Sequence, residues 1–280
     1  MTEFDFQYQV VLKEVLKNGQ VQFHQRTNHQ IISAPGLTLE MTKGFPLLTL
    51  RQIPLKVFVA EQVWYLTGSN RPEPFLRRFT KIWDAFTEKD GTVAAAYGYR
   101  WRHHFGRDQL ALLIKHLTEE PSSRQGVVMI WDPADDSLSS PVPKKNNPCP
   151  ICFVVNIIQD HLNFHLIIRS SDVILGLPHD VAGFALLQRL LAAKLESKIG
   201  KLTVSLSHAH IYDVHYQAAQ ELISRDHDHA EIELQVTPGD FDRAEKGDPD
   251  LVKEIVEKLS AQYRPLAKMK LAPVVVGEAR

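Results

Sequence analysis

The chain has 280 residues, of which 44% are hydrophobic, and its 32 Lys and Arg against 33 Asp and Glu give a net charge of −1. This near-neutral balance argues against a charge-driven nucleic-acid coat or a polybasic membrane binder, so we expect no membrane association and no dedicated nucleic-acid partner. Two cysteines exclude a disulfide-stapled scaffold and a zinc site made of cysteines alone. The acidic start does not resemble a signal peptide, and no apolar run reaches the roughly 20 residues of a membrane span. We therefore expect a cytoplasmic globular protein.

Apolar periodicity predicts five helices in chain order, over residues 6–17, 55–67, 109–117, 181–195 and 251–259. Short apolar runs predict strands over 37–41, 47–50, 127–131, 151–158, 162–168, 202–206 and 232–236. The runs at 151–158 and 162–168 are nearly all apolar, which is typical of strands buried on both faces. Helices and strands alternate without a regular βαβ rhythm. We expect a single α+β domain over residues 1–280, built on a mixed sheet, with 181–195 as a helix through the core.

Cys149 and Cys152 form a C-x-x-C pair at the start of a predicted buried strand. A redox motif of the thioredoxin type would instead lie between a strand and a helix. Cys152 is best interpreted as a small core residue. Cys149 follows Asn-Asn-Pro at a loop-to-strand junction, where it is either an inert thiol or a nucleophile.

Histidines are frequent, with His208, His210 and His215 in one group and His227 and His229 in another. Two histidines separated by one residue on a strand share a face, so metal binding is one interpretation. The alternative, which we favour, is that the second pair is solvated and that the chain binds no metal.

Two further residues have both a structural and a functional interpretation. Asp180 precedes the predicted central helix, where an N-cap is the ordinary role of Asp. Arg169 ends a predicted buried strand, and it is costly to bury unless an anion pairs with it. That anion is either a carboxylate such as Asp172 or a phosphate.

Taken together, these residues resemble the thymidylate synthase family along nearly the whole chain. The most specific stretch is 169–178, Arg-Ser-Ser-Asp-Val-Ile-Leu-Gly-Leu-Pro, which is similar to the family's Arg-Ser-x-Asp-x-x-Leu-Gly-x-Pro. The other matching blocks are Arg26-Thr27, Gly44-Phe45-Pro46-Leu47, residues 61–68, Ile82-Trp83-Asp84, residues 97–102, Asp108-Gln109-Leu110, Pro121-Ser122-Ser123-Arg124, Pro148-Cys149, His210-Ile211-Tyr212 and residues 272–276.

The resemblance implies a thymidylate synthase-like fold that forms a homodimer through its sheet, a pyrimidine nucleoside monophosphate as substrate, and 5,10-methylenetetrahydrofolate as co-substrate. A thiolate at carbon 6 of the pyrimidine makes carbon 5 nucleophilic toward a one-carbon donor, and nearby arginines would favour that thiolate. The implied catalytic residues are Cys149, Glu61, Tyr97 and Asp180. The implied nucleotide-binding residues are Arg26, Arg124 (donated by the second subunit), Arg169, Ser170, Asp172, Asp180, His210 and Tyr212. The implied folate-binding residues are Trp83, Phe86, Asp172, Leu175, Gly176, His179 and Val275.

The departures from the family pattern concern the base and the water content of the site. Asp180 stands where thymidylate-forming members have Asn, and a carboxylate accepts from the amine of cytosine but opposes the carbonyl of uracil. The resemblance is therefore greatest to the cytidylate hydroxymethylases. Phe86 replaces a Trp and His179 replaces a Phe, and residues 277–280 extend the chain. These three changes favour a site that admits more water. Water rather than hydride would then add to the one-carbon unit, which gives hydroxymethyl instead of methyl.

We therefore predict a folate-dependent hydroxymethyltransferase that acts on dCMP or CMP. One alternative is a methyltransferase of the same fold that acts on dUMP or dCMP. Another is a nucleotide-binding protein without catalysis, since Pro150, Gln125 and Ile168 replace a His, a second Arg and a Gln of the family. A metal hydrolase built on the histidines is a third.

Overall fold

The computed structural model describes residues 1–136 and 144–274. Short 3₁₀ helices at Leu76–Arg78, Asp84–Phe86 and Asp213–His215 and a short π-helix at Arg100–His104 join the longer elements. The helices are α1 (Glu3–Asn18), α2 (Leu55–Leu66), α3 (Tyr97–Tyr99), α4 (Gln109–Glu119), α5 (Leu177–Lys194), α6 (Tyr216–Ser224), α7 (Pro238–Glu245) and α8 (Pro249–Ser260). The strands are β1 (Gln20–His24), β2 (His29–Met41), β3 (Val127–Met129), β4 (Pro150–Ile158), β5 (His161–Ile168), β6 (Ser171–Asp172) and β7 (Lys198–Tyr212).

The strands of the described residues form one mixed sheet in the order β1-β2-β7-β5-β4-β3, and β6 pairs with β7 beside this path. Strand β7 runs parallel to β5 and β6, whereas the other neighbouring pairs are antiparallel. Near its end, β7 places Tyr212 opposite Ile31 of β2 and His210 opposite Asp172 of β6. Segments far apart in sequence thus converge at this end of the sheet, and the mixed α+β architecture expected from the sequence is confirmed.

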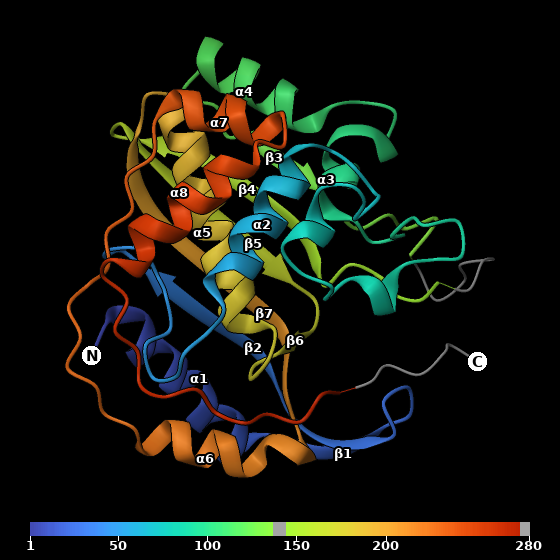
Figure 1. Cartoon of the computed structure of the whole chain (residues 1–280), viewed down its shortest axis with the longest axis vertical. Coiled ribbons are helices and arrows are strands. Elements are labelled where there is room, and N and C mark those ends of the chain that lie inside the picture. Colours follow the sequence, from blue (N-terminus) through green and yellow to red (C-terminus); the bar gives the residue numbers. More distant parts are fainter. Residues whose placement is uncertain (137–143, 275–280) are drawn as a thin grey trace.

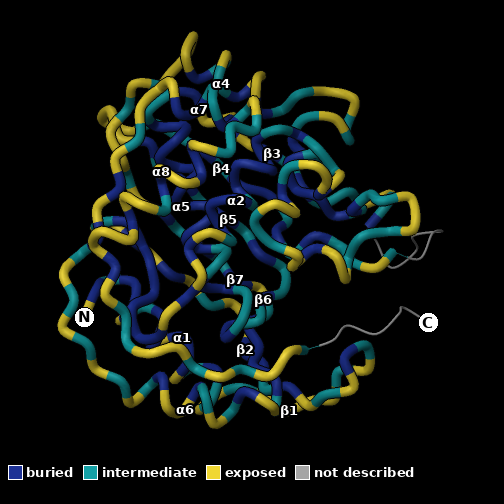
Figure 2. Tube along the Cα trace, in the orientation of Figure 1, coloured by how far each residue is buried: buried dark blue, intermediate teal, exposed yellow. Residues whose placement is uncertain are grey.

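Helix α5 is the centre of the core, as its apolar sequence predicts. Nearly all of its side chains are buried, and it packs against β5, β7, α2 and α7. Figure 1 shows α5 in the middle of the molecule, with α2 and α8 beside it and α1 and α6 at the other end of the sheet. Buried segments concentrate around α5 and β7 in Figure 2. Within the described ranges, no helix is both long and apolar enough to cross a bilayer.

The expectation that the central strands are buried on both faces is not met within the single chain. Along β5, Leu162, Phe164, Leu166 and Ile168 are buried, and the residues between them are partly exposed. The reason is that α5 covers only one face of the sheet at this strand.

Two predicted strands, 47–50 and 232–236, are extended segments without strand pairing. Their apolar side chains are buried, but side chains satisfy much of their backbone. The Thr49 N–H donates to Asp5 at 2.8 Å, and the Glu233 N–H donates to Gln262 at 2.9 Å. A buried backbone needs hydrogen-bond partners, and here side chains supply them instead of a neighbouring strand.

Candidate active site

The structure contains a cavity of about 440 Å³. The ends of β6 and β7 and the start of α5 line one part of it. Helix α2, the β1–β2 hairpin and the loop before β4 line the rest. Arg124 is exposed between α4 and β3 and does not line it, and Val275 lies outside the described residues. The other predicted site residues all line this cavity: Arg26, Glu61, Trp83, Phe86, Tyr97, Cys149, Arg169, Ser170, Asp172, Leu175, Gly176, His179, Asp180, His210 and Tyr212.

Cys149 is held in the cavity wall by Arg169, which fixes the loop before β4. The Arg169 backbone N–H donates to the Cys149 carbonyl at 2.9 Å, and its Nε donates to the Pro148 carbonyl at 2.9 Å. The guanidinium also lies over the ring of Trp131, 5.1 Å from its centroid. This arginine therefore positions the thiol through the backbone while it faces the cavity itself.

Burial raises the pKa of the Cys149 thiol to about 11, and Asp180 raises it further, while Arg169 opposes the shift. The expectation that arginines keep this thiol ionised is therefore not met in the isolated chain, because burial outweighs the neighbouring cation. Cys152 is buried in β4, in keeping with its interpretation as a core residue, and both cysteines are free thiols.

Glu61 and Trp83 form a hydrogen-bonded pair in the cavity. Glu61 lies on α2, and the Trp83 indole Nε1–H donates to its Oε1 at 2.5 Å. Burial raises the pKa of Glu61 to about 8, although the indole bond favours the charged form. A carboxyl with such a pKa can both give and take a proton near neutral pH.

Tyr97 begins α3 beside this pair, with its ring centroid 6.0 Å from that of Trp83. Burial raises the pKa of Tyr97 well above its usual value, and a hydrogen bond with the Cys149 backbone opposes that shift. The phenol is therefore neutral beside the thiol.

Asp180 lies inside the first turns of α5 rather than at its cap. The helix begins at Leu177 with Gly176 as N-cap residue, and Pro178 occupies the first turn. The N-cap interpretation of Asp180 is therefore wrong, because the helix starts earlier than its apolar run. Proline is favoured at this position, since its missing N–H needs no partner there.

Burial raises the pKa of Asp180 to about 7, and the charge of Asp172 adds to the shift. Among the described residues, no hydrogen-bond donor is paired with the Asp180 side chain, so its carboxyl group is available to a ligand in the cavity. Asp172 differs, because its Oδ1 accepts the N–H groups of Ile174 at 2.9 Å and Leu175 at 3.0 Å. Asp172 therefore shapes the turn that leads from β6 into α5.

His210 and Tyr212 lie on one face of β7, with ring centroids 5.1 Å apart and planes perpendicular. Arg26 reaches the same region from the turn between β1 and β2, where its Nη2 donates to the Lys145 carbonyl at 3.1 Å. Its Nε is buried without a partner among the described residues. A polar ligand at this end of the cavity would satisfy that donor.

Several residues that line the cavity were not assigned to it from the sequence: His24, Phe58, Gln62, Tyr65, Lys145, Asn146, Asn147 and His208. A signal existed for His208, because it is two residues before His210 on one strand and so shares its face. A weaker signal existed for His24, because it lies two residues before the matching Arg26-Thr27 block, although the β1–β2 hairpin was not expected.

The histidine groups have structural partners that their sequence does not reveal. His215 bonds the Ala272 carbonyl at 2.9 Å and His227 bonds the Arg264 carbonyl at 2.6 Å. His229 accepts the Arg264 N–H at 3.1 Å. Both His227 and His229 are partly exposed, and both also bond the backbone of Arg264 and so hold the C-terminal segment.

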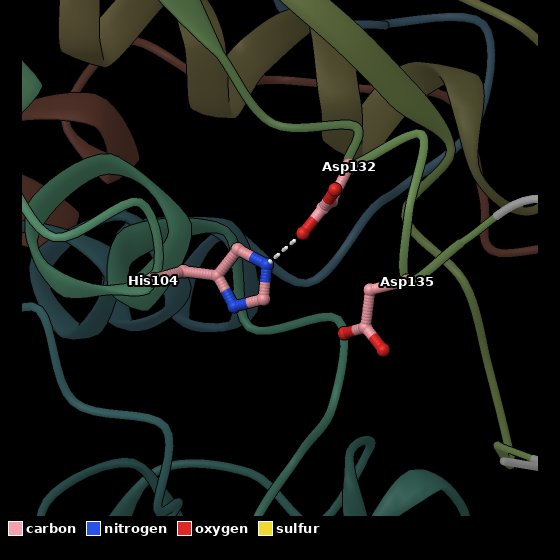
Figure 3. Close-up of side chains that lie close together, drawn as sticks. All are labelled: His104, Asp132 and Asp135. Atoms are coloured by element: carbon pink, nitrogen blue, oxygen red, sulfur yellow. Dashed lines mark hydrogen bonds and ion pairs between the residues drawn. The ribbon is translucent and has the colours of Figure 1, made fainter. Parts of the chain in front are cut away.

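In the described part of the chain, the one group with metal-ligand geometry is His104, Asp132 and Asp135, which is outside the cavity (Figure 3). His104 bonds Asp132 at 2.7 Å, and Asp135 pairs with Lys144 at 2.5 Å. Side chains of the protein thus already engage both carboxylates, so this group gives no specific support for a metal.

The sequence profile of the family described as Thymidylate synthase matches residues 6–270 of the chain. Enzymes of this family transfer a one-carbon unit from methylenetetrahydrofolate to carbon 5 of a pyrimidine nucleotide, and they are typically dimeric. The match covers far more than half of the chain and includes every cavity residue described above except Val274. The chain therefore belongs to the thymidylate synthase family and is a folate-dependent one-carbon transferase.

Proposed function

We propose that this enzyme hydroxymethylates carbon 5 of a cytidine monophosphate, dCMP or CMP, with methylenetetrahydrofolate as donor. The observation that supports this most is the Asp180 carboxyl group, which lines the cavity near Cys149 and serves no helix cap. This half-buried carboxyl group has no hydrogen-bond donor among the described residues, so it can pair with a ligand that enters the cavity.

The protonation state of Asp180 decides which base it favours. When ionised, it accepts a hydrogen bond from the exocyclic amine of cytosine, whereas the same position in uracil carries a carbonyl acceptor. When protonated, the carboxyl offers one donor and one acceptor, as an Asn amide does, and it then suits uracil as well. Because the pKa of Asp180 is about 7, both states are accessible near neutrality.

The neighbouring groups fit addition of a thiolate to carbon 6. The Cys149 thiol would give its proton to a carboxylate of the cavity, and its sulfur would bond to carbon 6. Carbon 5 would then bond to the one-carbon unit, and loss of the carbon 5 proton and of tetrahydrofolate would leave an exocyclic methylene. Water would add to this methylene to give the hydroxymethyl group. Tyr97 and Glu61 line the cavity on the Cys149 side and supply neutral, proton-carrying groups. Release of the sulfur from carbon 6 completes the cycle.

The cavity also suits a folate. Trp83, Phe86 and Leu175 give an apolar wall with aromatic faces, on which a planar ring stacks well. The Nδ1 of His179 is buried there without a partner among the described residues. The co-substrate supplies a one-carbon unit that becomes an exocyclic methylene on the pyrimidine, and these residues would hold and orient it.

The choice of hydroxymethyl over methyl rests on His179. Burial lowers the pKa of His179 to about 4, so its ring is neutral and has one donor and one acceptor nitrogen. A neutral imidazole in the cavity wall can hold a water molecule near the methylene, which the Phe of most family members cannot do. Residues 277–280, which also entered this argument, lie outside the described residues.

We further propose that two copies pair through the sheet face that α5 leaves uncovered, and that Arg124 of each copy completes the other's site. The support is the exposure of Arg124 away from the cavity of its own chain. Mixing the inactive variants Cys149→Ala and Arg124→Ala should restore activity, because a mixed dimer would contain one intact site. If reassociated mixtures stay inactive, the shared site is wrong.

The test of the proposed function is a set of separate incubations of the enzyme and methylenetetrahydrofolate with dCMP, CMP or dUMP. A 5-hydroxymethyl product on a cytidine nucleotide, identified by mass spectrometry, is the expected outcome. A 5-methyl product on dUMP would replace the proposal by thymidylate synthesis. Binding without any product, and without exchange of the carbon 5 hydrogen, would indicate a noncatalytic binder.

A further inference from the structure

Gln62 is a buried polar residue in the wall of the cavity. It follows Glu61 on α2, lines the cavity, and is only 1% exposed. Its Nε2 has no hydrogen-bond partner among the described residues. A buried amide donor without a partner lowers stability, and such a group is explained when a ligand supplies the acceptor.

Gln188 on α5 shows how a structural glutamine behaves in the same fold. It is also 1% exposed, but its Nε2 donates to the carbonyls of Leu162 at 3.0 Å and Gly200 at 3.1 Å. These bonds join α5 to β5 and β7. Within the described residues, the Nε2 of Gln62 makes no such bond, so the fold alone does not explain its amide.

The Gln62 amide lies beside the part of α5 that carries Asp180. Helices α2 and α5 pack against each other. A Cβ added to Gly183 would have the Gln62 Oε1 as its nearest contact outside its own stretch of helix, at 3.7 Å. Gly183 is three residues after Asp180, so the two share a face of α5, and both line the cavity. The glycine therefore leaves space between the amide and the face that carries Asp180.

The neighbours of Gln62 on α2 also lie near Asp180. Burial is the main cause of the raised pKa of Glu61 and of Tyr65, and the charge of Asp180 adds to both shifts. A charge acts in this way on groups that are close to it. Because Gln62 lies between Glu61 and Tyr65 on the helix and lines the same cavity, its amide belongs to the same end of the site as Asp180.

Cytosine requires two kinds of partner along its base-pairing edge. Its exocyclic amine donates hydrogen bonds, and the neighbouring ring atom N3 accepts one. An ionised Asp180 can accept from the amine, but its second oxygen offers N3 only another acceptor. An N–H group beside the carboxylate would supply the donor that N3 needs.

We propose that the Gln62 Nε2 donates a hydrogen bond to N3 of cytosine while Asp180 accepts from the exocyclic amine. This rests on the proposed cytidine nucleotide substrate and adds a second base-reading residue to it. The ionised Asp180 and the Gln62 amide then match cytosine at both positions, and no proton on Asp180 is required. In uracil N3 carries a hydrogen, so the amide would have to turn its oxygen to the ring.

The test uses 3-deaza-dCMP, in which a C–H group replaces N3 and the amine is retained. Its dissociation constant and that of dCMP are measured by calorimetry without folate at about pH 8.5, where Asp180 is mostly ionised and cannot donate to N3. The wild type should bind the analogue about tenfold more weakly, because the buried Nε2 stays unpaired. Gln62→Met has no donor to lose, so it should bind the two nucleotides equally to within about twofold.

Thermal unfolding separates this role from a structural one. Gln62→Met replaces an unpaired buried amide by an apolar chain of similar length, so Tm should stay the same or rise. Gln188→Met is the matched control. It should lower Tm, because it loses the bonds to β5 and β7, and it should keep the tenfold ratio, because Gln188 does not line the cavity.

A tenfold ratio that persists in Gln62→Met, or equal binding of the two nucleotides by the wild type, would overturn the proposal. Gln62→Leu is used if the methionine variant does not fold, and failure of both to fold would show that Gln62 is structural and contradict the proposal as well. A wild type that binds dUMP more tightly than dCMP would overturn the proposed function together with this inference. A persistent ratio with dCMP preferred would overturn this inference alone, so the two failures are distinguishable.

Discussion

At the base end of the cavity, formed by Glu61, Tyr97, Cys149 and Asp180, burial raises the pKa values of two carboxyls to about 8 and about 7. At the opposite end, which His24, Arg26, His208 and His210 line, burial lowers the pKa of His210 to about 4 and also lowers that of His24. Desolvation favours the uncharged form at both ends, so acids keep their protons and bases lose theirs. The comparison teaches that burial favours the neutral forms of the carboxyls and imidazoles in the empty site. Under our proposal, the phosphate and the cytosine amine of a bound nucleotide would favour their charged forms.

The largest expected effect is at the base end, on the thiol. Cys149→Ala should lower turnover by at least about 10⁴-fold, because no other group can form the bond to carbon 6. Nucleotide affinity should change little, since Arg26, His210 and Tyr212 are untouched. The measurements are kcat and the dissociation constant of dCMP.

Cys152→Ala is the control for this change. It should keep turnover and lose only stability, because Cys152 is buried in β4 outside the cavity lining. Equal losses of activity in the two variants would mean that Cys149 acts through folding rather than as the nucleophile.

The next largest effect is expected on the choice between cytosine and uracil as the substrate's base. Asp180→Asn is nearly isosteric and should shift the ratio of kcat/KM for dCMP over dUMP toward dUMP by about 100-fold, the equivalent of one lost and one gained base contact. Steady-state assays with each nucleotide measure this ratio. An unchanged ratio would show that Asp180 does not read the base.

Parts of the site that follow from local sequence patterns could be predicted, and parts that depend on tertiary contacts could not. The central helix was predictable because its apolar residues are buried all round. The match of Arg169–Pro178 to the family pattern located Asp172 and the turn into α5, and Asp180 follows two residues after the matched stretch. The start of α5 was mispredicted because the apolar run was taken as its beginning, although Pro178 is a helix-start signal.

The remaining errors have a tertiary cause. Leu47–Leu50 and Ile232–Val236 have apolar side chains like those of strands, but their backbone partners come from residues far away in sequence. The pKa of Cys149 likewise depends on how completely the fold buries it, which the residue types around it do not reveal. His24 enters the cavity only because β1 pairs with β2.

A smaller effect should appear in the pH dependence of base choice. Because the raised pKa of Asp180 is about 7, the carboxylate that favours cytosine forms as the pH rises through that value. The preference for dCMP over dUMP in binding should therefore increase by several-fold from about pH 6 to pH 8. Competition between the two nucleotides at each pH measures it, and the Asp180→Asn variant should show no such change.

The smallest expected effect tests the role of the hydrogen bond from the Trp83 indole to Glu61. Trp83→Phe removes the N–H that stabilises the Glu61 carboxylate, so the pKa of Glu61 should rise and the corresponding limb of the pH profile of kcat/KM should move upward by up to about one unit. Trp101→Phe is the control, because the Trp101 indole N–H has no partner among the described residues. A shift of the same size in both variants would show that packing, not the hydrogen bond, sets the profile.

The most direct test of the central claim is a competition in one vessel. Equimolar dCMP and dUMP are incubated with the enzyme and methylenetetrahydrofolate at about pH 8, where Asp180 is mostly ionised, and the products are separated by mass. We predict that 5-hydroxymethyl-dCMP is the main product and that dUMP is largely unchanged. If thymidylate forms instead, the assignment of Asp180 to cytosine and of His179 to water would both be contradicted.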